Sequence, residues 1–231
     1  MKTPITYYGG KQTLADHIIS QIPAHRIYCE PFFGGGAVFF RKGKSKLEVI
    51  NDIDERLINF YTVAQNNFGE LKNRIDSTLN SESQYVHAKD IWNDREPAGS
   101  VEKAWAVWLI TNGSFAGSMH GGWKWSNGTS GSHTGVYIEN KRNIFNKHLH
   151  ERLRHVQISC RDAITVIKNR DSVDTFFYID PPYPGSYQGH YRGYTHTDLF
   201  DLLQVLSTIK GKFMLSNYWS QTLKYFILKN G

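Results

Sequence analysis

The strongest constraint on the fold is an apolar run, residues 175–179, that ends in Asp180, Pro181, Pro182 and Tyr183. The run reads Thr-Phe-Phe-Tyr-Ile, which is typical of a buried strand. Because proline has no backbone N–H and a fixed φ, the strand must end in a stiff turn. Free carbonyl oxygens and a flat tyrosine ring at this corner suit a planar group that carries an NH2, such as a nucleobase. A plain turn after a core strand is the alternative interpretation.

Short apolar runs alternate with helical patterns on both sides of a long middle segment. Strands are expected at 26–30, 47–50, 155–160, 175–179 and 212–216, and helices at 37–40, 55–66, 163–168 and 198–209. This alternation predicts an α/β fold with a mostly parallel, doubly wound sheet and right-handed crossovers. If residues 155–160 form the third strand, the strand order is 3-2-1-4-5, and the ligand crevice lies between strands 1 and 4.

The middle segment, residues 69–154, has a different character. A polar helical part leads into residues 101–110, where Trp105 and Trp108 are spaced as core residues of a helix. Residues 112–135 are so rich in Gly, Ser, Trp and His that we expect neither a regular helix nor a central strand there. A long functional loop or a disordered segment would fit this composition. We therefore expect a domain formed by residues 1–68 and 155–231, with a second domain, 69–154, inserted into it.

Composition limits the partners, the metal sites and the cellular location that we expect for the protein. The formal net charge of +6 favours a polyanionic partner, although the signal is weak by itself. Cys29 and Cys160 fit neither a disulfide framework nor a metal site, so we expect inert core thiols. The histidines His148, His150 and His155 lack a metal-ligand pattern, and no metal is expected. Without a signal segment or a membrane-spanning run, the chain is expected to be soluble and cytoplasmic.

Two further motifs follow the first two strands. Glu30 to Gly36 places three glycines between a strand and a helix, which permits close approach of a ligand to the backbone. Ala37 follows the third glycine, so the turn differs from the dinucleotide-binding motif, and no phosphate-loop lysine is present. Asp52 or Asp54, after the second strand, could bind ribose hydroxyls, or could cap a helix. The two motifs together indicate a cofactor that contains a nucleoside.

In sequence order, the motifs are Tyr7 to Lys11 (Tyr-Tyr-Gly-Gly-Lys), Glu30 to Gly36, residues 51–54 (Asn-Asp-Ile-Asp) and Asp180 to Tyr183. This order closely resembles the Dam-like, alpha-group DNA adenine-N6 methyltransferases over nearly the whole chain. The last motif also occurs in some RNA guanine methyltransferases, whereas the first two are more specific. The resemblance implies a class I methyltransferase fold with an inserted target-recognition domain. It also implies site-specific methyl transfer from S-adenosylmethionine to adenine N6 in duplex DNA by base flipping.

The resemblance assigns a role to individual residues. The cofactor-binding residues that it implies are Tyr7, Lys11, Glu30, Phe32, Phe33, Gly34, Asp52, Asp162 and Asp180. The catalytic residues are Asp180, Pro181, Pro182 and Tyr183. We expect Asp180 and the carbonyl of Pro181 to accept the two amino hydrogens, and Tyr183 to stack on the base. Alignment of the methyl donor with the amine would then provide much of the rate.

The inserted segment is expected to contact DNA. Candidate phosphate contacts are Lys124, Lys141, Arg142, Lys147 and Arg152, and candidates for base edges are Asn112, Asn127 and His133. Phe115 matches an aromatic wedge, and Asn217, with Ser216, resembles a later motif at the base pocket. Ala116 stands where GATC-specific members carry asparagine, and His120 stands near their base-reading arginine. Both departures count against GATC as the target.

The alternatives concern other residues and other functions. For Trp123 and Trp125, a role in the core and a role in base stacking are equally supported. Lys42, Lys44 and Lys46 are expected in a solvated turn. RNA or cytosine amino methylation is a rival activity, and a DNA-binding module without catalysis is a rival class. A partner restriction endonuclease and a monomeric state are further expectations. The chain stops soon after its last expected helix, which would fit a truncated or unusually short protein.

Overall fold

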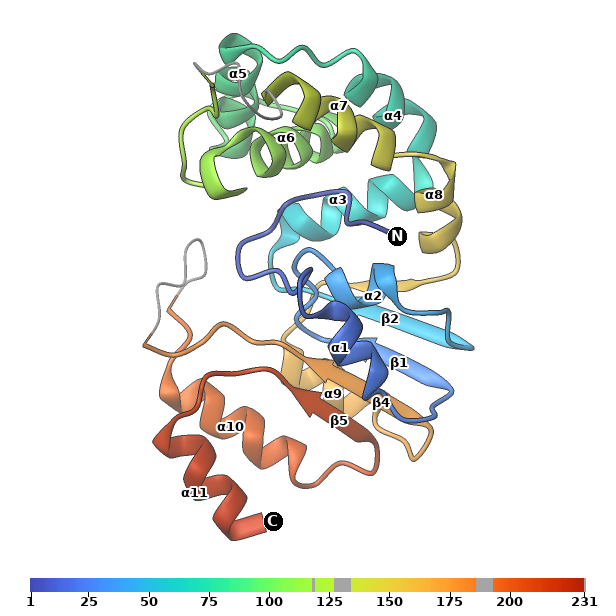
Figure 1. The fold of residues 1–231 in the computed structure, drawn as a ribbon, viewed down its shortest axis with the longest axis vertical. Coiled ribbons are helices and arrows are strands. Elements are labelled where there is room, and N and C mark those ends of the chain that lie inside the picture. Colours follow the sequence, from blue (N-terminus) through green and yellow to red (C-terminus); the bar gives the residue numbers. More distant parts are fainter. Residues whose placement is uncertain (118, 127–133, 186–192, 231) are drawn as a thin grey trace.

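The computed structural model describes residues 1–117, 119–126, 134–185 and 193–230. Its centre is a sheet of five parallel strands in the order β3-β2-β1-β4-β5 (Figure 1). The strands are β1 (Ile27–Glu30), β2 (Leu47–Asn51), β3 (Gln157–Ser159), β4 (Thr175–Ile179) and β5 (Lys212–Leu215). The predicted α/β class and strand order are both confirmed.

Strands β1 and β4, which each have a neighbouring strand on both sides, are buried on both faces, and their residues alternate between two cores. Tyr28 and Phe176 point to the core that contains α2 (Ala37–Arg41) and α3 (Glu55–Asn66). Cys29 and Phe177 point to the opposite core. Because side chains alternate along a strand, continuous apolar runs are what a sheet covered on both faces requires.

The remaining helices of the sheet region are α1 (Ala15–Ser20), α9 (Ala163–Arg170), α10 (His196–Leu206) and α11 (Gln221–Asn230). Helices α9 and α10 cover the face that Cys29 and Phe177 share, and α1 lies with α2 on the other face. Helix α10 begins with a reciprocal capping box, in which Thr195 and Asp198 each accept the other's backbone N–H. None of the described helices is both long enough and apolar enough to cross a membrane.

Residues between α3 and β3 form a second, helical group that packs on α3 (Figure 1). Its members are α4 (Phe68–Asp76), α5 (Glu82–Trp92), α6 (Ser100–Gly113), the 3-10 helix η1 (Phe115–Gly117), α7 (Thr134–Ile144) and α8 (Lys147–Leu153). Trp105 and Trp108 are fully buried in α6, as predicted. The dark blue N-terminal segment runs between this group and the sheet.

One prediction for the helical group was wrong at its two ends, although the described residues 114–117 and 119–126 contain no α-helix, as expected. Residues 112–135 were expected to lack regular helix, but Asn112 and Gly113 complete α6, and Thr134 and Gly135 begin α7. Packing explains the difference, because α6 is buried along its last ten residues. A Cβ on Gly113 would lie 3.4 Å from Tyr85 Cδ2, so a small residue suits this helix end although its propensity is poor.

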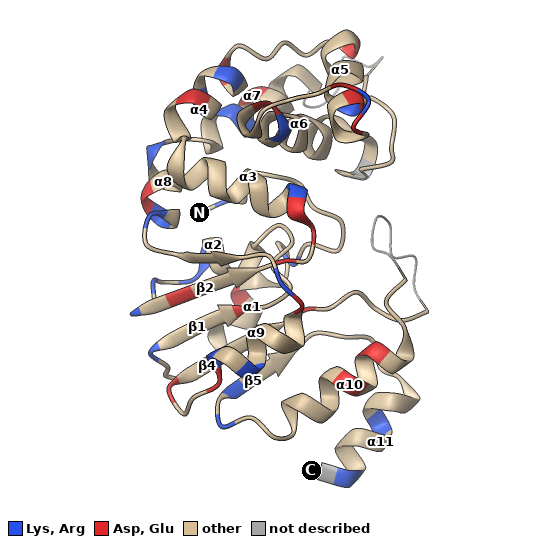
Figure 2. Ribbon diagram, turned by 180° about the vertical axis from the view of Figure 1, so that it is seen from behind, with Lys and Arg blue, Asp and Glu red and all other residues tan. Residues whose placement is uncertain are grey.

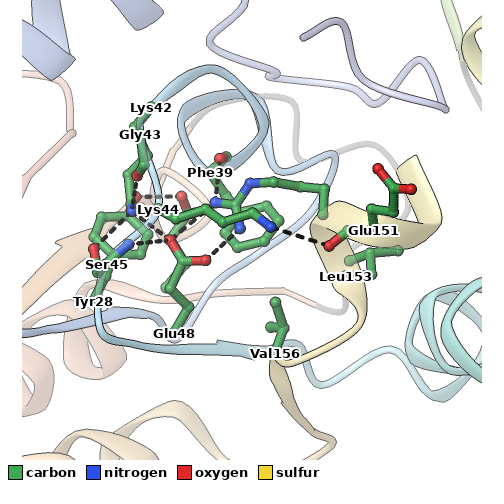
Figure 3. Close-up of polar contacts among 12 residues, drawn as sticks. Tyr28, Phe39, Lys42, Gly43, Lys44, Ser45, Glu48, Glu151, Leu153 and Val156 are labelled. Carbon is green, nitrogen blue, oxygen red and sulfur yellow. Dashed lines mark hydrogen bonds and ion pairs between the residues drawn. The ribbon is translucent and has the colours of Figure 1, made fainter. Parts of the chain in front are cut away.

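A buried ion cluster joins α8 to the sheet (Figure 3). Glu48 on β2 accepts hydrogen bonds from Lys42 Nζ at 2.6 Å and from Arg152 Nη2 at 2.9 Å. Arg152 also donates to the carbonyl of Phe39, and Lys42 Nζ lies 4.0 Å from the centre of the Tyr28 ring. The expected solvated position of Lys42 and phosphate contact of Arg152 are therefore wrong, because both cations compensate the charge of Glu48.

The expectations for the other lysines of this turn and for Cys29 are confirmed, whereas the expectation for Cys160 is wrong. Lys44 and Lys46 are exposed, as predicted for the turn before β2. Cys29 is buried, and burial raises the pKa of its thiol, as expected of an inert core cysteine. Cys160 is exposed, contrary to the prediction, because it follows β3, the short strand at the edge of the sheet that the described residues form.

Candidate active site

The carboxyl ends of β1, β2 and β4 bring three carboxylates to one edge of the sheet. Glu30 ends β1, Asp52 follows β2 and Asp180 follows β4. Strands β1 and β4 lie side by side at the point where the strand order reverses, which is where ligands bind in such sheets. In Figure 2, acidic residues colour α10 and the start of α3 near this edge, whereas Lys and Arg mark the opposite ends of several strands.

A cavity of about 1000 Å³ opens at this edge. Its lining includes Phe32, Ile53 and Ile164, with the carboxylates Asp52, Asp162 and Asp180. A small recess adjoins it, formed by residues 7–11 of the N-terminal segment, by the glycine turn and by Tyr178. Phe32 and Asp180 line both spaces. The predicted cofactor motifs and the Asp180 corner therefore meet around two spaces that share lining residues.

Both carboxylate oxygens of Asp180 accept hydrogen bonds. Lys11 Nζ lies 2.7 Å from Oδ2, and the Tyr183 hydroxyl donates to Oδ1 at 3.0 Å. Lys11 also donates to the carbonyl of Gly9 at 2.8 Å. Burial raises the pKa of Asp180, and the adjacent Lys11 ammonium opposes this rise. The structure thus joins the first and last sequence motifs, in which Lys11 and Asp180 are 169 positions apart, through one ion pair.

Glu30 lies in the recess and is 2% exposed. Its carboxyl group accepts a short hydrogen bond from the hydroxyl of Tyr28, two residues earlier on the same face of β1. Burial raises the pKa of Glu30 to about 8, although the Tyr28 hydrogen bond and the charge of Lys42 oppose the rise. A cationic ligand in the recess would favour the ionised form of Glu30.

The glycine turn is held against Asp52. Gly34 has a φ of 50° and donates its N–H to Asp52 Oδ2 at 2.8 Å. The N–H of Asp54 donates to the other oxygen of Asp52 at 3.0 Å. Asp54 itself caps α3 by accepting the N–H of Arg56. The two acidic residues therefore have different roles: Asp54 is the helix cap, and Asp52 is a buried carboxylate at the cavity wall. Burial raises the pKa of Asp52 to about 6.

Two other expected cofactor residues have local partners in the fold. Asp162 caps α9 by accepting the N–H of Thr165 at 2.8 Å, and it lines the cavity from an exposed position. Phe33 is 3% exposed and packs edge-on against Tyr61 at a ring distance of 4.8 Å. A Cβ on Gly36 would lie 2.4 Å from Phe33 Cζ, so the turn closes tightly over this ring. Phe33 supports the turn from the core side.

Sequence reasoning missed Asn51, which ties three segments together at the sheet edge. Its side-chain amide donates to the carbonyls of Pro31 and Arg161, both at 2.9 Å. Its side-chain oxygen accepts from Ser159 and from the N–H of Arg161. The only signal was an asparagine before Asp52, which the sequence analysis treated as part of a motif. Tyr194, which lines the cavity and contacts Phe32 edge-on, was also missed because it lies in an irregular segment.

Several residues expected to contact DNA are placed inside the protein. Asn112 is 1% exposed, and both of its side-chain polar atoms have protein partners. Lys141 is 8% exposed and donates to the carbonyl of Thr3 at 3.4 Å; burial lowers its pKa to about 8. Arg142 is partly buried and donates to the carbonyl of Thr78. The structure therefore does not present Asn112 or Lys141 to a ligand.

Other candidates lie on the surface near a small hairpin, which we define by its described residues, 114–117 and 119–124. Ser114 and Trp123 form an antiparallel bridge in it, and Phe115 is 50% exposed at its start. Lys124 Nζ lies 4.3 Å from the centre of the Tyr137 ring. Trp123 packs partly against the core, whereas Trp125 is 55% exposed. We refer to this element as the recognition hairpin.

The remaining residues that the sequence predicted to contact DNA or the target base lie in several parts of the chain. Lys147 is exposed on α8, and His120 is exposed in the recognition hairpin. Asn217 follows Ser216, which hydrogen-bonds Tyr178 at 2.9 Å beside the recess. The buried amide nitrogen of Asn217 has no hydrogen-bond partner within the described part of the chain. The predicted base-edge contacts Asn127 and His133 lie outside the described residues.

The strand order and the ligand spaces at its switch point are those of a doubly wound α/β fold and are consistent with the class I methyltransferase fold. The chain belongs to the D12 class N6 adenine-specific DNA methyltransferase family, whose profile matches residues 7–230. Type II methyltransferase M.MjaIII of Methanocaldococcus jannaschii is 26% identical over 95% of this chain and 85% of its own length. Type II methyltransferase M1.LlaDCHI of Lactococcus lactis subsp. cremoris is 29% identical over 81% of this chain and 68% of its own length.

A DNA N-6-adenine-methyltransferase of Escherichia phage P1 is similar over a shorter region, with 29% identity over 47% of this chain and 15% of its own length. The family resemblance expected from the motifs is confirmed. The protein is an adenine-specific DNA methyltransferase, so DNA is its substrate and its reaction uses a methyl donor.

Proposed function

We propose that the methyl donor is S-adenosylmethionine and that the acceptor is an adenine flipped out of duplex DNA into the Asp180 corner. When bound, S-adenosylmethionine supplies an electrophilic methyl group on a sulfonium. The observation that carries the proposal is the Asp180 carboxylate, which borders both the large cavity and the recess and is held by Lys11 and Tyr183. Asp180 thus borders both spaces that we assign to the cofactor, and its Oδ1 would be the contact to the target amine.

The residues around the cavity fit this cofactor. Asp52 has both oxygens fixed by backbone N–H groups, and each oxygen keeps a lone pair for a ribose hydroxyl. Phe32, Ile53 and Ile164 offer apolar walls for an adenine ring. Tyr7, Lys11, Glu30 and Gly34 line the recess, where the negative charge of an ionised Glu30 would favour a cation. Asp162 remains a proposed contact to the adenine of the cofactor.

Asp180 would act on the amino group of the target base. That nitrogen is a weak nucleophile because its lone pair is delocalised into the ring. The N–H of an incoming adenine would replace the Tyr183 hydroxyl at Oδ1, and the carbonyl of Pro181 would accept the second hydrogen. Charge that develops on nitrogen would then be compensated by the carboxylate. Lys11, at 2.7 Å, favours the ionised form of Asp180 that this role requires.

Tyr183 would change partners when the base enters. Its hydroxyl now donates to Asp180, and its ring contacts Tyr218 edge-on at 4.7 Å. Released from Asp180, the Tyr183 ring would be able to stack on the flipped base. This stacking would offset part of the free energy needed to flip the base out of the duplex, which is roughly a few kcal/mol. The stiffness of Pro181 and Pro182 would keep the corner fixed during this exchange.

The helical group, residues 69–154, is proposed as the target-recognition domain. Phe115 would enter the duplex as a wedge, with Lys124 contacting a phosphate, because both lie on the recognition hairpin. Arg142 would contact DNA only if its hydrogen bond to Thr78 were exchanged, and Asn217 would face the base pocket. His120 and Ala116 continue to count against GATC as the target.

The names of the relatives support a place in a restriction–modification system, because two of them are type II methyltransferases. We propose that a partner restriction endonuclease reads the same sequence and that the methyltransferase acts as a monomer. Plasmid recovered from a host that expresses the protein should then resist one type II endonuclease. Sedimentation with a short duplex should give one protein per duplex; a dimer would contradict the monomeric state.

The variant Asp180→Ala tests the proposed mechanism. We expect the single-turnover rate of tritium transfer from labelled S-adenosylmethionine to plasmid DNA to fall by at least about a hundredfold. Calorimetry should still detect binding of S-adenosylmethionine. The control is Asp76→Asn on α4, whose carboxylate pairs with Lys72 far from the site and whose loss should leave the rate unchanged. Full activity of Asp180→Ala would overturn the assignment.

A further inference from the structure

Asn112 is a joint between the helical group and the N-terminal segment. Its Oδ1 accepts both the N–H and the hydroxyl of Thr6, each at 3.1 Å. Its Nδ2 donates to the carbonyl of Pro4 at 3.1 Å and to that of Trp108 at 3.0 Å. A buried amide with all of these partners holds one geometry, because any shift would leave a polar group unpaired. The end of α6 is therefore fixed to Thr6.

Two more elements of the helical group meet Thr6 at the same place. The hydroxyl of Thr6 directs its hydrogen to Asn112, so the hydroxyl of Tyr137 on α7 is the donor in the short hydrogen bond between these two residues. Gly117 has a φ of 66°, and a Cβ built on it would lie 2.9 Å from Thr6 Cγ2. The recognition hairpin thus packs directly on Thr6 through Gly117.

The residues that follow Thr6 lead directly to the catalytic corner. Tyr7 packs under the glycine turn, since a Cβ on Gly35 would lie 2.9 Å from the Tyr7 Cβ. The chain then turns at Gly10, whose N–H donates to the carbonyl of Tyr7, and Lys11 reaches Asp180. From Thr6 to Lys11 the backbone spans at most about 18 Å. A short, anchored segment therefore links the recognition hairpin to the carboxylate.

We propose that Thr6 and Asn112 are positioning residues that couple the seating of the recognition hairpin on DNA to the alignment of Lys11 with Asp180. The inference rests on the proposed function, in which the hairpin contacts DNA and Asp180 binds the target amine. Displacement of the hairpin by DNA would move Thr6, and the ion pair of Lys11 would respond. Because a misplacement of about 1 Å can slow a reaction about a hundredfold, a small movement is sufficient.

The test compares variants at the joint with a matched buried threonine. Thr6→Val keeps the methyl group that packs on Gly117 and removes the hydroxyl, Thr6→Ser restores the hydroxyl, and Tyr137→Phe removes the second partner. The control Thr78→Val changes a residue that is 1% exposed, and it removes a hydroxyl that accepts from Trp105 within the helical group. Each protein is assayed for single-turnover tritium transfer, for plasmid binding with S-adenosylhomocysteine present, for cofactor binding by calorimetry, and for melting temperature.

Thr6→Val and Tyr137→Phe are expected to lower the single-turnover rate about tenfold and to leave both dissociation constants within about twofold. Thr6→Ser should return to the wild-type rate, and Thr78→Val should lose melting temperature without losing rate. The proposal is wrong if Thr6→Val slows transfer no more than Thr78→Val, or if the loss lies in DNA affinity. Should Thr6→Val fail to fold, Tyr137→Phe decides. Wild-type activity and Asp180→Ala test the proposed function separately, so the two failures are distinguishable.

Discussion

At the scale of the residue, Glu30 shows how burial changes the chemistry of a carboxyl group. Its neighbours are the hydroxyl of Tyr28, the ammonium of Lys42, the carboxylate of Asp180 and the backbone of Phe39. Burial, to which the charge of Asp180 adds, outweighs the other three groups and raises the pKa of Glu30 to about 8. In the free protein at neutral pH, Glu30 is therefore mainly protonated. A cation that binds in the recess would promote loss of this proton.

The pKa of Glu30 predicts how stability depends on pH. Because the folded value of about 8 exceeds the unfolded value of about 4.5, the folded state binds the proton more tightly between these pH values. This contribution to stability is complete below pH 4.5 and is lost as pH rises through 8. Glu30→Gln cannot ionise and keeps an acceptor for Tyr28. The melting temperature of Glu30→Gln should therefore rise relative to that of the wild type as the pH increases from 5 to 8.5. The expected difference is about 3 °C for each kcal/mol of unfolding free energy that the wild type loses.

Thermal unfolding of the free protein at several pH values measures this difference. Asp52 has a raised pKa of about 6, but it is present in both proteins, so its contribution cancels. A gap between Glu30→Gln and the wild type that stays constant from pH 5 to 8.5 would show that Glu30 does not titrate in this range.

At the scale of the element, the ion cluster determines how α8 is held against the sheet. Burial alone would raise the pKa of Glu48, but the hydrogen bonds from Arg152 and Lys42 together hold it below its usual value. Burial lowers the pKa of Lys42. The Glu48 carboxylate thus compensates the charge of both cations. Its loss should therefore reduce stability more than the loss of either cation.

Unequal losses of stability should follow from removing members of the cluster. Glu48→Gln leaves two buried cations without a counter-charge and should lower the free energy of unfolding by about 3–5 kcal/mol. Arg152→Met keeps the Lys42–Glu48 pair and should have a smaller effect. As an exposed control, Lys72→Gln breaks an ion pair on α4 and should change stability by less than about 1 kcal/mol. Urea unfolding measures all three; equal losses for Glu48→Gln and Arg152→Met would contradict this order.

The elements themselves were largely predictable from the sequence. The strand 175–179 and the helix 55–66 match the structure. The strand is a continuous apolar run that is followed by two prolines, and the helix has a helical apolar repeat and begins after the cap residue Asp54. The error at residues 112–135 has a tertiary cause. Asn112 is a poor helix former, but its side chain is bound by Thr6 and Pro4, which are more than 100 positions away in sequence. No local pattern contains that information.

At the scale of the whole molecule, the net charge of +6 favours DNA, but burial decides which cations can reach it. The sequence treated Lys124 and Lys141 alike, although only Lys124 lies on the recognition hairpin. Lys124→Gln should reduce the slope of log Kd against log salt by about one for plasmid or duplex DNA. Lys141→Met should leave the slope unchanged, because Lys141 contacts Thr3 inside the protein. Fluorescence anisotropy at several salt concentrations measures both, and equal changes would contradict the assignment.

The sequence by itself determined the strands and the motifs at their ends, because periodicity and turn residues are local properties. The strand order and the switch point followed from the rule for doubly wound sheets, with residues 155–160 taken as the third strand. The sequence also determined the family, because four motifs occur in a fixed order. Only the tertiary structure decided which charges are buried, as for Lys42, Arg152 and Lys141, since burial depends on residues distant in sequence. The same reason made Asn112 a joint to the N-terminal segment and brought Lys11 to Asp180 across most of the chain.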